Sequence, residues 1–269
     1  MNSFKPVIRE GVMKTRHHLT DLKGLAFIGV IFVVTVLRSQ VVPSVWQQID
    51  DLNETKDFDG AYALLAPLEG EYGDDVRYLW RLARHHFNNS DNTTDEAVIE
   101  QELNTGFEFS QKALAADSAS ADAHGFYGIL IGRVGEIKGT KQKILNSYDV
   151  KKHTMKAIEL DPENDSWQHV MGRWHYTLAD LSWFERQIAS LIYAAPPKAS
   201  FEEAEQYFAR AAELDPEDIR HFLWLGKTQL ELDKEEATRA SLETAVSLPP
   251  KSDSDAILQD EAQELLKKL

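Results

Sequence analysis

The six residues Ala211–Pro216 (AAELDP) recur in outline as Ala245–Pro250 (AVSLPP), 34 positions further along the chain. Two related stretches precede them, Ala157–Pro162 (AIELDP) and Ala113–Ser118 (ALAADS), the second of which lacks the proline. Each of the first three stretches in chain order is followed by a segment that contains a glycine, and these glycines are Gly128, Gly172 and Gly226. Self-similarity of this kind predicts a stack of repeated units.

The spacing within the units is that of the tetratricopeptide repeat, which has a period of 34 residues and the pattern W-x2-L-G-x2-Y…A-x3-F…P. Gly226 and Pro250 are 24 residues apart, as in that repeat, whereas Gly172 and Pro216 are 44 apart. The extra residues therefore fall between the two helices of one unit, and not between units. Small residues let paired helices approach closely, and the closing proline ends the second helix.

We predict an all-α fold, a tetratricopeptide-repeat-like α-solenoid of about four degenerate helix pairs with inserts, preceded by a short N-terminal apolar helix. Because no pair can bury its apolar face alone, residues 44–269 are expected to form one helical domain after a basic N-terminus, residues 1–43. Composition agrees, since 14 glycines and 9 prolines in 269 residues argue against a turn-rich β fold.

Composition also excludes several classes of function. The chain has no cysteine, which excludes a disulfide scaffold, a cysteine-ligated metal and a thiol nucleophile. Its formal net charge of −15 disfavours binding to nucleic acid. The sequence contains no H-E-x-x-H metal motif, no phosphate-binding glycine loop and no G-x-S-x-G nucleophile elbow. We therefore expect a non-enzymatic protein with no catalytic residue, no metal site and no cofactor.

Residues 24–37 (GLAFIGVIFVVTVL) form the one long uncharged stretch, which Lys23 and Arg38 bracket. Fourteen helical residues span about 21 Å, less than the roughly 30 Å core of a bilayer, although snorkelling of the flanking basic side chains extends this length. A cleaved signal peptide fits the length of the run, but no A-x-A-like site follows it. A buried helix fits less well, because the run is apolar on all sides. We favour a membrane anchor.

The orientation of this anchor stays open. Five basic residues precede the run, so the positive-inside rule would leave the N-terminus in the cytosol and carry the rest of the chain across the membrane. Four N-x-S/T sequons would then be exposed to glycosylation, at Asn53, Asn88, Asn92 and Asn164. A short, weakly hydrophobic segment with basic flanks is also typical of mitochondrial outer-membrane anchors, which leave the following domain in the cytosol.

The insert of the third unit carries the most distinctive motif, with GRWHYTLADLSWFER at 172–186 and PPKASFEEA at 196–204. It resembles the regulator of microtubule dynamics family, whose tetratricopeptide-repeat domains carry GRW-x-Y-x3-A-x-LSW-x-ER followed by PP-x-A-[ST]-[FY]-EEA. Three other stretches agree with that family, namely WRLAR at 80–84, GTKQKI at 139–144 and HTMKAIELDP at 153–162. The resemblance covers roughly residues 61–246.

The resemblance implies a non-enzymatic protein that associates with microtubules and spindle poles. One branch of the family has an N-terminal anchor in the mitochondrial outer membrane, tethers mitochondria to the endoplasmic reticulum and handles phospholipid with its repeat domain. This chain has an anchor candidate like that branch. It lacks the long linker that carries the branch's acidic, two-phenylalanine docking motif, so the resemblance does not extend to tethering by that motif.

Residues 133–156 form a basic island, with seven Lys/Arg against two Asp/Glu. Lys141, Lys152 and Lys156 are eleven and four residues apart, so they can share one helical face. Such a face can dock an acidic protein segment, such as the acidic tails of tubulin, or anionic lipid headgroups. The alternative is a solvated helix that offsets its acidic neighbours. The candidate partner-binding residues are Arg133, Lys138, Lys141, Lys143, Lys151, Lys152 and Lys156.

Aromatic residues around the insert are candidates for a ligand groove. Large side chains at helical spacing are more often core than ligand site, but solenoids bind peptides on their inner face, and an apolar groove can also hold an acyl chain. The candidates are Trp167, Trp174, Tyr176, Trp183, Phe184 and Tyr193.

Two hypotheses of function follow. The first is an interaction protein that associates with microtubules or the spindle, facing the cytosol and anchored by residues 24–37. The alternative is a membrane-anchored organelle-contact protein that binds or transfers phospholipid in its groove. One expected location is the cytoplasmic face of the mitochondrial outer membrane or of the endoplasmic reticulum. The other is on microtubules and the spindle, and the protein can occupy both.

Overall fold

A computed structural model describes residues 44–192 and 195–269. The N-terminal segment 1–43, with the anchor candidate 24–37, lies outside the described residues, as does the groove candidate Tyr193. Residues 44–269 form a single compact unit.

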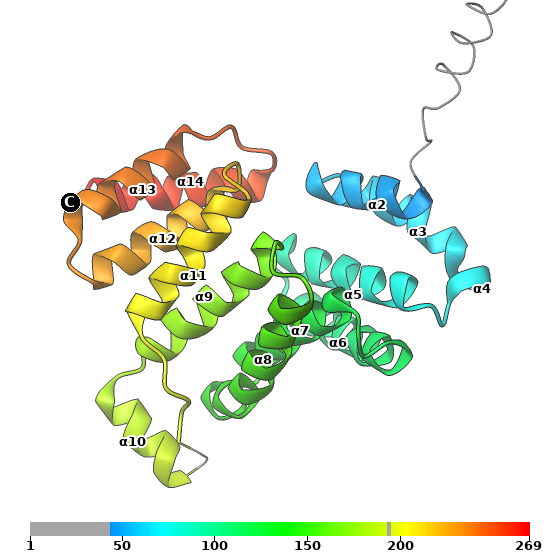
Figure 1. Cartoon of the computed structure of the whole chain (residues 1–269), viewed down its shortest axis with the longest axis horizontal. Coiled ribbons are helices and arrows are strands. Elements are labelled where there is room, and N and C mark those ends of the chain that lie inside the picture. Colours follow the sequence, from blue (N-terminus) through cyan, green and yellow to red (C-terminus); the bar gives the residue numbers. More distant parts are fainter. Residues whose placement is uncertain (1–43, 193–194) are drawn as a thin grey trace, which may run out of the picture. The chain divides into compact units, whose positions relative to one another are not determined.

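The described residues are helical and contain no strand. The helices, drawn in Figure 1, are α2 (Val45–Glu54), α3 (Phe58–Leu65), the 3-10 helix η1 (Ala66–Leu68), α4 (Glu69–Tyr72), α5 (Val76–Asp91), α6 (Glu96–Ala116), α7 (Ala121–Ile137), α8 (Thr140–Leu160), α9 (Asp165–Ala179), α10 (Trp183–Ile192), α11 (Phe201–Leu214), α12 (Ile219–Glu231), α13 (Glu235–Ser247) and α14 (Asp253–Leu266).

The helices pack as pairs that follow one another along the chain. Helix α5 packs against α6, α7 against α8, α9 against α11, and α12 against α13, while α2 and α3 precede these pairs and α14 covers the last one. The prediction of an α-solenoid of about four helix pairs is therefore confirmed. Helix α10 lies in the connection between α9 and α11, where the spacing of Gly172 and Pro216 indicates an insert.

The small residues of the repeat allow the two helices of a pair to approach closely. A Cβ atom on Gly172 would lie 2.7 Å from the ring of Phe208 on α11, and one on Gly226 would lie 2.7 Å from a methyl carbon of Leu242 on α13. The alanine that opens each repeated stretch is fully buried in the second helix of its pair, and these are Ala113, Ala157, Ala211 and Ala245. The spacing in the sequence thus marks the positions where two helices meet.

Ala113 and Ala157 are 44 residues apart, ten more than the period of 34, and the second unit accommodates these extra residues differently. Helices α7 and α8 are 17 and 21 residues long, against 13 each for α12 and α13. Only Lys138 and Gly139 connect α7 to α8, and Gly139 has a φ of 88°, which a glycine adopts without strain. The extra residues therefore lengthen both helices and form no separate insert.

Candidate functional site

The basic island occupies the end of α7, the turn that follows and most of α8. Lys138, Lys141, Lys151 and Lys152 are exposed, whereas Arg133, Lys143 and Lys156 are half-buried. Helix α8 begins without a side-chain cap and has no acidic residue in its first turn. Apart from Lys138, which lies in the turn, the lysines are carried by one long helix that packs on α7.

Two lysines of the island share a surface hollow. A hollow of about 450 Å³ is lined by His124, Lys152, Met155, Lys156 and Glu159. The Nζ atom of Lys156 lies 2.7 Å from Oε1 of Glu159, which lines the same hollow. The structure thus brings Lys152 and Lys156 together, beside the exposed thioether of Met155.

The other members of the island lie in different surroundings. Arg133 pairs with Asp91 at 2.7 Å and with Glu136 at 3.3 Å, so its charge is already compensated. Lys151 lies over the ring of Trp174, with its Nζ atom 4.7 Å from the ring centroid. These two cations therefore contribute less to an open basic surface than their number suggests.

The five aromatic groove candidates that the structure describes lie in different surroundings. Trp167 and Trp174 are buried in the core, and the indole N–H of Trp174 donates to the carbonyl of Ser147 at 2.8 Å. Trp183 and Phe184 lie exposed on α10. Tyr176 is half-buried on α9 and belongs to a different surface.

That surface contains residues that the sequence reasoning missed. The guanidinium carbon of Arg173 lies 3.8 Å from the centroid of the Trp224 ring, and Lys227 Nζ lies 4.2 Å from the same centroid. The ring of Tyr176 meets Trp224 edge-on at 5.2 Å, and burial, assisted by the charge of Glu231, raises the pKa of Tyr176 to about 12. The signal that could have found these two cations is their position in the repeat, because Arg173 directly follows Gly172 and Lys227 directly follows Gly226.

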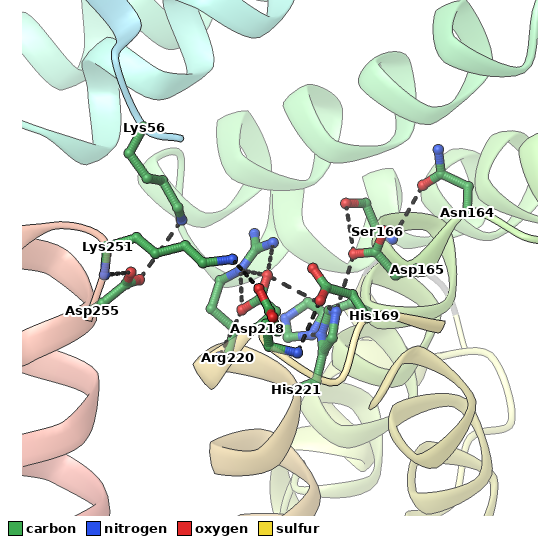
Figure 2. A network of polar contacts seen from close by, with 12 residues as sticks. Lys56, Asn164, Asp165, Ser166, His169, Asp218, Arg220, His221, Lys251 and Asp255 are labelled. Carbon is green, nitrogen blue, oxygen red and sulfur yellow. Dashed lines mark hydrogen bonds and ion pairs between the residues drawn. The ribbon is translucent and has the colours of Figure 1, made fainter. Parts of the chain in front are cut away.

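A network of polar contacts joins α9 to α12 (Figure 2). The Nδ1 atoms of His169 and His221 lie 3.0 Å apart, and His221 Nε2 donates to Asp165 at 3.0 Å. Asp218 accepts hydrogen bonds from the backbone and the side chain of Arg220. Burial opposes ionisation of Asp218, but the charge of Arg220 and its hydrogen bonds outweigh burial and lower the pKa of this carboxyl group.

Asp165, Asp218 and His221 offer ligand atoms that lie within 4.8 Å of one another, as a metal site would. Both oxygens of Asp218 are already bonded to the Arg220 guanidinium, whose positive charge would repel a cation at that point. The geometry therefore fits an ion-pair network that links two repeat units. Nearby, Lys56 Nζ approaches Asp255 of α14 at 3.7 Å.

Three of the four sequon asparagines have internal hydrogen bonds. Asn88 donates to Asn53 at 3.0 Å, and Asn53 donates to the carbonyl of Ile49 at 2.9 Å. The side chain of Asn164 accepts a hydrogen bond from the amide of Ser166 and so caps α9. A glycan would be attached to the Nδ2 atom, which is the hydrogen-bond donor in Asn53 and Asn88, whereas the contact of Asn164 uses its Oδ1 atom.

In the part of the chain that the structure describes, no helix is long and apolar enough to cross a membrane. The anchor candidate, residues 24–37, falls in the part that is not described.

The chain is similar in sequence to a group of regulators of microtubule dynamics. The family model described as regulator of microtubule dynamics protein 1-3 matches residues 45–269. Regulator of microtubule dynamics protein 1 from Bos taurus is 36% identical over 228 residues, which cover 84% of this chain and 71% of the relative. The protein of the same name from Pongo abelii is 34% identical over 271 residues, or 99% of this chain and 86% of the relative.

Among solved structures, a thermophilic tetratricopeptide-repeat protein from Thermus thermophilus matches with a TM-score of 0.58. The match covers 82% of this chain and 97% of that chain at 14% sequence identity. At this identity the likeness concerns the fold alone, and it agrees with the stacked helix pairs described above.

Proposed function

The chain belongs to the regulator of microtubule dynamics family, and from that premise we propose that it is a non-enzymatic interaction protein that associates with microtubules. The relatives are named as regulators of microtubule dynamics, and the stacked helix pairs form an interaction scaffold of the kind that repeat proteins use. The contact we propose is between the basic surface of α8 and an acidic protein segment, such as the acidic tails of tubulin.

The observation that carries the proposal is the hollow that contains Lys152 and Lys156. It places two ammonium groups beside an apolar side chain, Met155, in a protein whose formal net charge is −15. Glu159 offsets Lys156 within the hollow, so the net positive charge there comes from Lys152, which stands out in an acidic domain as a point of attraction for an acidic segment. Both lysines lie on one helix, α8.

The test is co-sedimentation of residues 44–269 with stabilised microtubules. Reversal of both hollow lysines, Lys152→Glu with Lys156→Glu, should reduce the bound fraction by at least tenfold, because two attractive charges become repulsive. The matched control is Lys267→Glu with Lys268→Glu at the other end of the domain. It changes the net charge equally, and Lys267 also forms an i,i+3 ion pair, with Glu264.

Equal loss in both double variants would show a general effect of net charge and would contradict the proposed surface. Binding that neither variant changes would contradict it as well. Absence of pelleting by the unchanged domain at low salt would exclude direct binding to microtubules by residues 44–269.

Anchoring by residues 24–37 is a separate part of the proposal and rests on the sequence alone. It would place the helical domain at the cytoplasmic face of the mitochondrial outer membrane or the endoplasmic reticulum. Carbonate extraction of membranes that contain the full chain, compared with a chain in which Val30 and Val34 are changed to Asp, tests it. Release of the full chain into the soluble fraction would contradict anchoring. The phospholipid-groove alternative gains no specific support, because two of the aromatic candidates in the described part of the chain are buried in the core and two are exposed on α10.

A further inference from the structure

Three basic residues occupy equivalent positions in the repeat, because each directly follows the small residue in the first helix of its pair. They are Arg84 after Ala83 on α5, Arg173 after Gly172 on α9, and Lys227 after Gly226 on α12. Ala83 is completely buried, and a Cβ atom on Gly106 of α6 would lie 3.2 Å from the Ala83 carbonyl oxygen. Helices α5 and α6 therefore meet at Ala83, as the later pairs meet at their glycines, and the three cations can be compared directly.

Two of these cations have a carboxylate partner that comes from outside their own helix pair. Arg84 Nη2 donates to Asp50 Oδ1 of α2 at 2.7 Å. Lys227 Nζ donates to Glu261 Oε1 of α14 at 2.7 Å. In these two units, the chain itself thus supplies a carboxylate to the cation at this position.

Arg173 has no such partner in the part of the chain that the structure describes. Its guanidinium makes no hydrogen bond or ion pair there, and its Nε atom is buried without an acceptor. The Nε atom of Arg84 is buried in the same way, but Asp50 binds the end of that side chain. A buried N–H group that has lost its water and found no acceptor is unfavourable, so an acceptor from outside the chain would be bound favourably.

The carboxylates that lie closest to Arg173 are bound to other cations. Asp91 and Glu136 both pair with Arg133 of α7, at 2.7 Å and 3.3 Å. Glu261 is bonded to the lysine of α12, as described above. Burial lowers the pKa of Arg173, although the charges of these three carboxylates oppose the shift. They therefore do not take the place of a direct partner.

An aromatic ring keeps the Arg173 guanidinium in position. Its central carbon lies 3.8 Å from the centroid of the Trp224 ring, and Trp224 in turn packs edge-on against Tyr176. Arg173 is half-buried, so part of its side chain is open to a ligand. A guanidinium presents its N–H donors as a planar fork, which matches the two oxygen atoms of a carboxylate.

We infer that Arg173 binds a carboxylate of an acidic peptide segment from a partner protein. The equivalent positions select this chemistry, because the groups that bind Arg84 and Lys227 are the side chains of an aspartate and a glutamate. Arg173 also belongs to the GRW motif at 172–174 that the chain shares with its family. The contact includes no residue of the hollow on α8, so it does not rest on the proposed function.

The test is fluorescence anisotropy of residues 44–269, a single compact unit, with a short labelled peptide of alternating Glu and Gly. The peptide should bind saturably, and Arg173→Gln should weaken binding by at least about tenfold, because a half-buried charged donor is lost. The same peptide with Gln in place of Glu should bind the unchanged domain more weakly by a similar factor. Arg239→Gln is the matched control, since it removes the same charge from a side chain on α13 that is 44% exposed.

Two measurements separate loss of the contact from loss of the fold. Circular dichroism and thermal denaturation show whether each variant is folded. Arg173→Lys retains the positive charge but not the planar fork, so it should bind the peptide several-fold more weakly than the unchanged domain. The side-chain Nε–H resonance of Arg173, identified in nitrogen-15 spectra by its absence from Arg173→Lys, should shift when the Glu peptide is added.

The proposed function gives the hollow on α8 a similar ligand, so each comparison is repeated with Lys152→Glu and Lys156→Glu in the domain. Loss of all peptide binding in this double variant would contradict the inference and leave the proposed function standing. The inference would also be overturned by equal binding of the Gln peptide, by unchanged binding in Arg173→Gln, or by an Arg173 resonance that the peptide does not shift. Tighter binding of inorganic phosphate than of the peptide would show a phosphate site and overturn the assignment to a carboxylate.

Discussion

The Nδ1 atoms of His169 and His221 lie 3.0 Å apart, so one hydrogen atom is shared between two ring nitrogens of adjacent repeat units. If both rings were cationic, two N–H groups would face each other at this distance. Burial, followed by the charge of His221, lowers the pKa of His169 well below its usual value. A second pair, His124 and His153, has the same Nδ1–Nδ1 arrangement at 2.9 Å between α7 and α8.

These pairs predict that the domain loses stability in mild acid. Burial, and then the charge of His124, lowers the pKa of His153 from 6.5 to about 4. As the pH falls from about 6.5 to about 4, His153 therefore binds a proton in the unfolded chain but not in the folded chain. The stability that is present above pH 6.5 is lost over this range of pH. We expect a loss of about 2 kcal/mol from His153. Urea denaturation at pH 7.5 and pH 5 measures it, and His153→Gln should reduce the difference. An unchanged midpoint would contradict the prediction.

Gly172→Ala should destabilise the third helix pair. The added Cβ would lie 2.7 Å from the Phe208 ring, and that ring is completely buried, so it has little room to move. We expect a loss of about 1–3 kcal/mol in the free energy of unfolding. Gly70→Ala is the control, since a Cβ there meets no atom within 4 Å. Thermal denaturation of both variants distinguishes the close approach from a general effect of replacing glycine.

Arg81→Met should lower the free energy of unfolding by more than Arg77→Met does. The Arg81 side chain is 7% exposed, donates to Asp50 at 3.0 Å and to the carbonyl of Arg77 at 2.8 Å, and lies over the Trp80 ring. Removal of the Arg81 guanidinium leaves Asp50 paired with Arg84 alone, so we expect the free energy of unfolding to fall by about 2 kcal/mol. Arg77 is half exposed and pairs with its neighbour Asp75, and its loss should cost under about 1 kcal/mol. Equal costs would show that the buried pair adds nothing to stability.

Binding of residues 44–269 to microtubules should weaken steeply with salt. The proposed contact joins lysines on the surface of α8 to acidic segments, and charges separated by water are screened over about 8 Å at physiological ionic strength. Pelleting at low and at moderate salt should therefore differ several-fold. Pelleting that does not depend on salt would indicate an apolar contact in place of the basic hollow.

The spacing of small residues was sufficient to predict the fold, because Gly172, Gly226 and the buried alanines are required wherever two helices touch. The exposure of the aromatic residues could not be predicted in the same way. Trp167 is 2% exposed and Trp183 is 74% exposed, although both follow helical spacing in one stretch of sequence. The difference arises because α9 lies within the stack, whereas α10 lies in the connection between two stacked helices. The periodicity of side chains does not encode whether a helix joins the stack.

The basic island shows the same limit. Its spacing predicts a shared helical face, and α8 supplies that helix. Only Lys152 and Lys156 line the hollow, because tertiary partners determine the surroundings of the others, such as Asp91 for Arg133 and the Trp174 ring for Lys151.

Helices α9 and α11 pack together although the chain between them leaves the stack to form α10. The ends of the joining segment are held by contacts, such as those of Arg186 with the carbonyls of Leu178 and Leu181. Between these ends, side chains such as Leu191 are exposed, so substitutions there should disturb the fold less. Within a repeat whose other positions are fixed by packing, this is a place where natural selection can change what the protein contacts without changing how it folds. Differences in partner among related chains are therefore expected to accumulate in residues 187–195, between the two halves of the family motif, sooner than in the helices on either side.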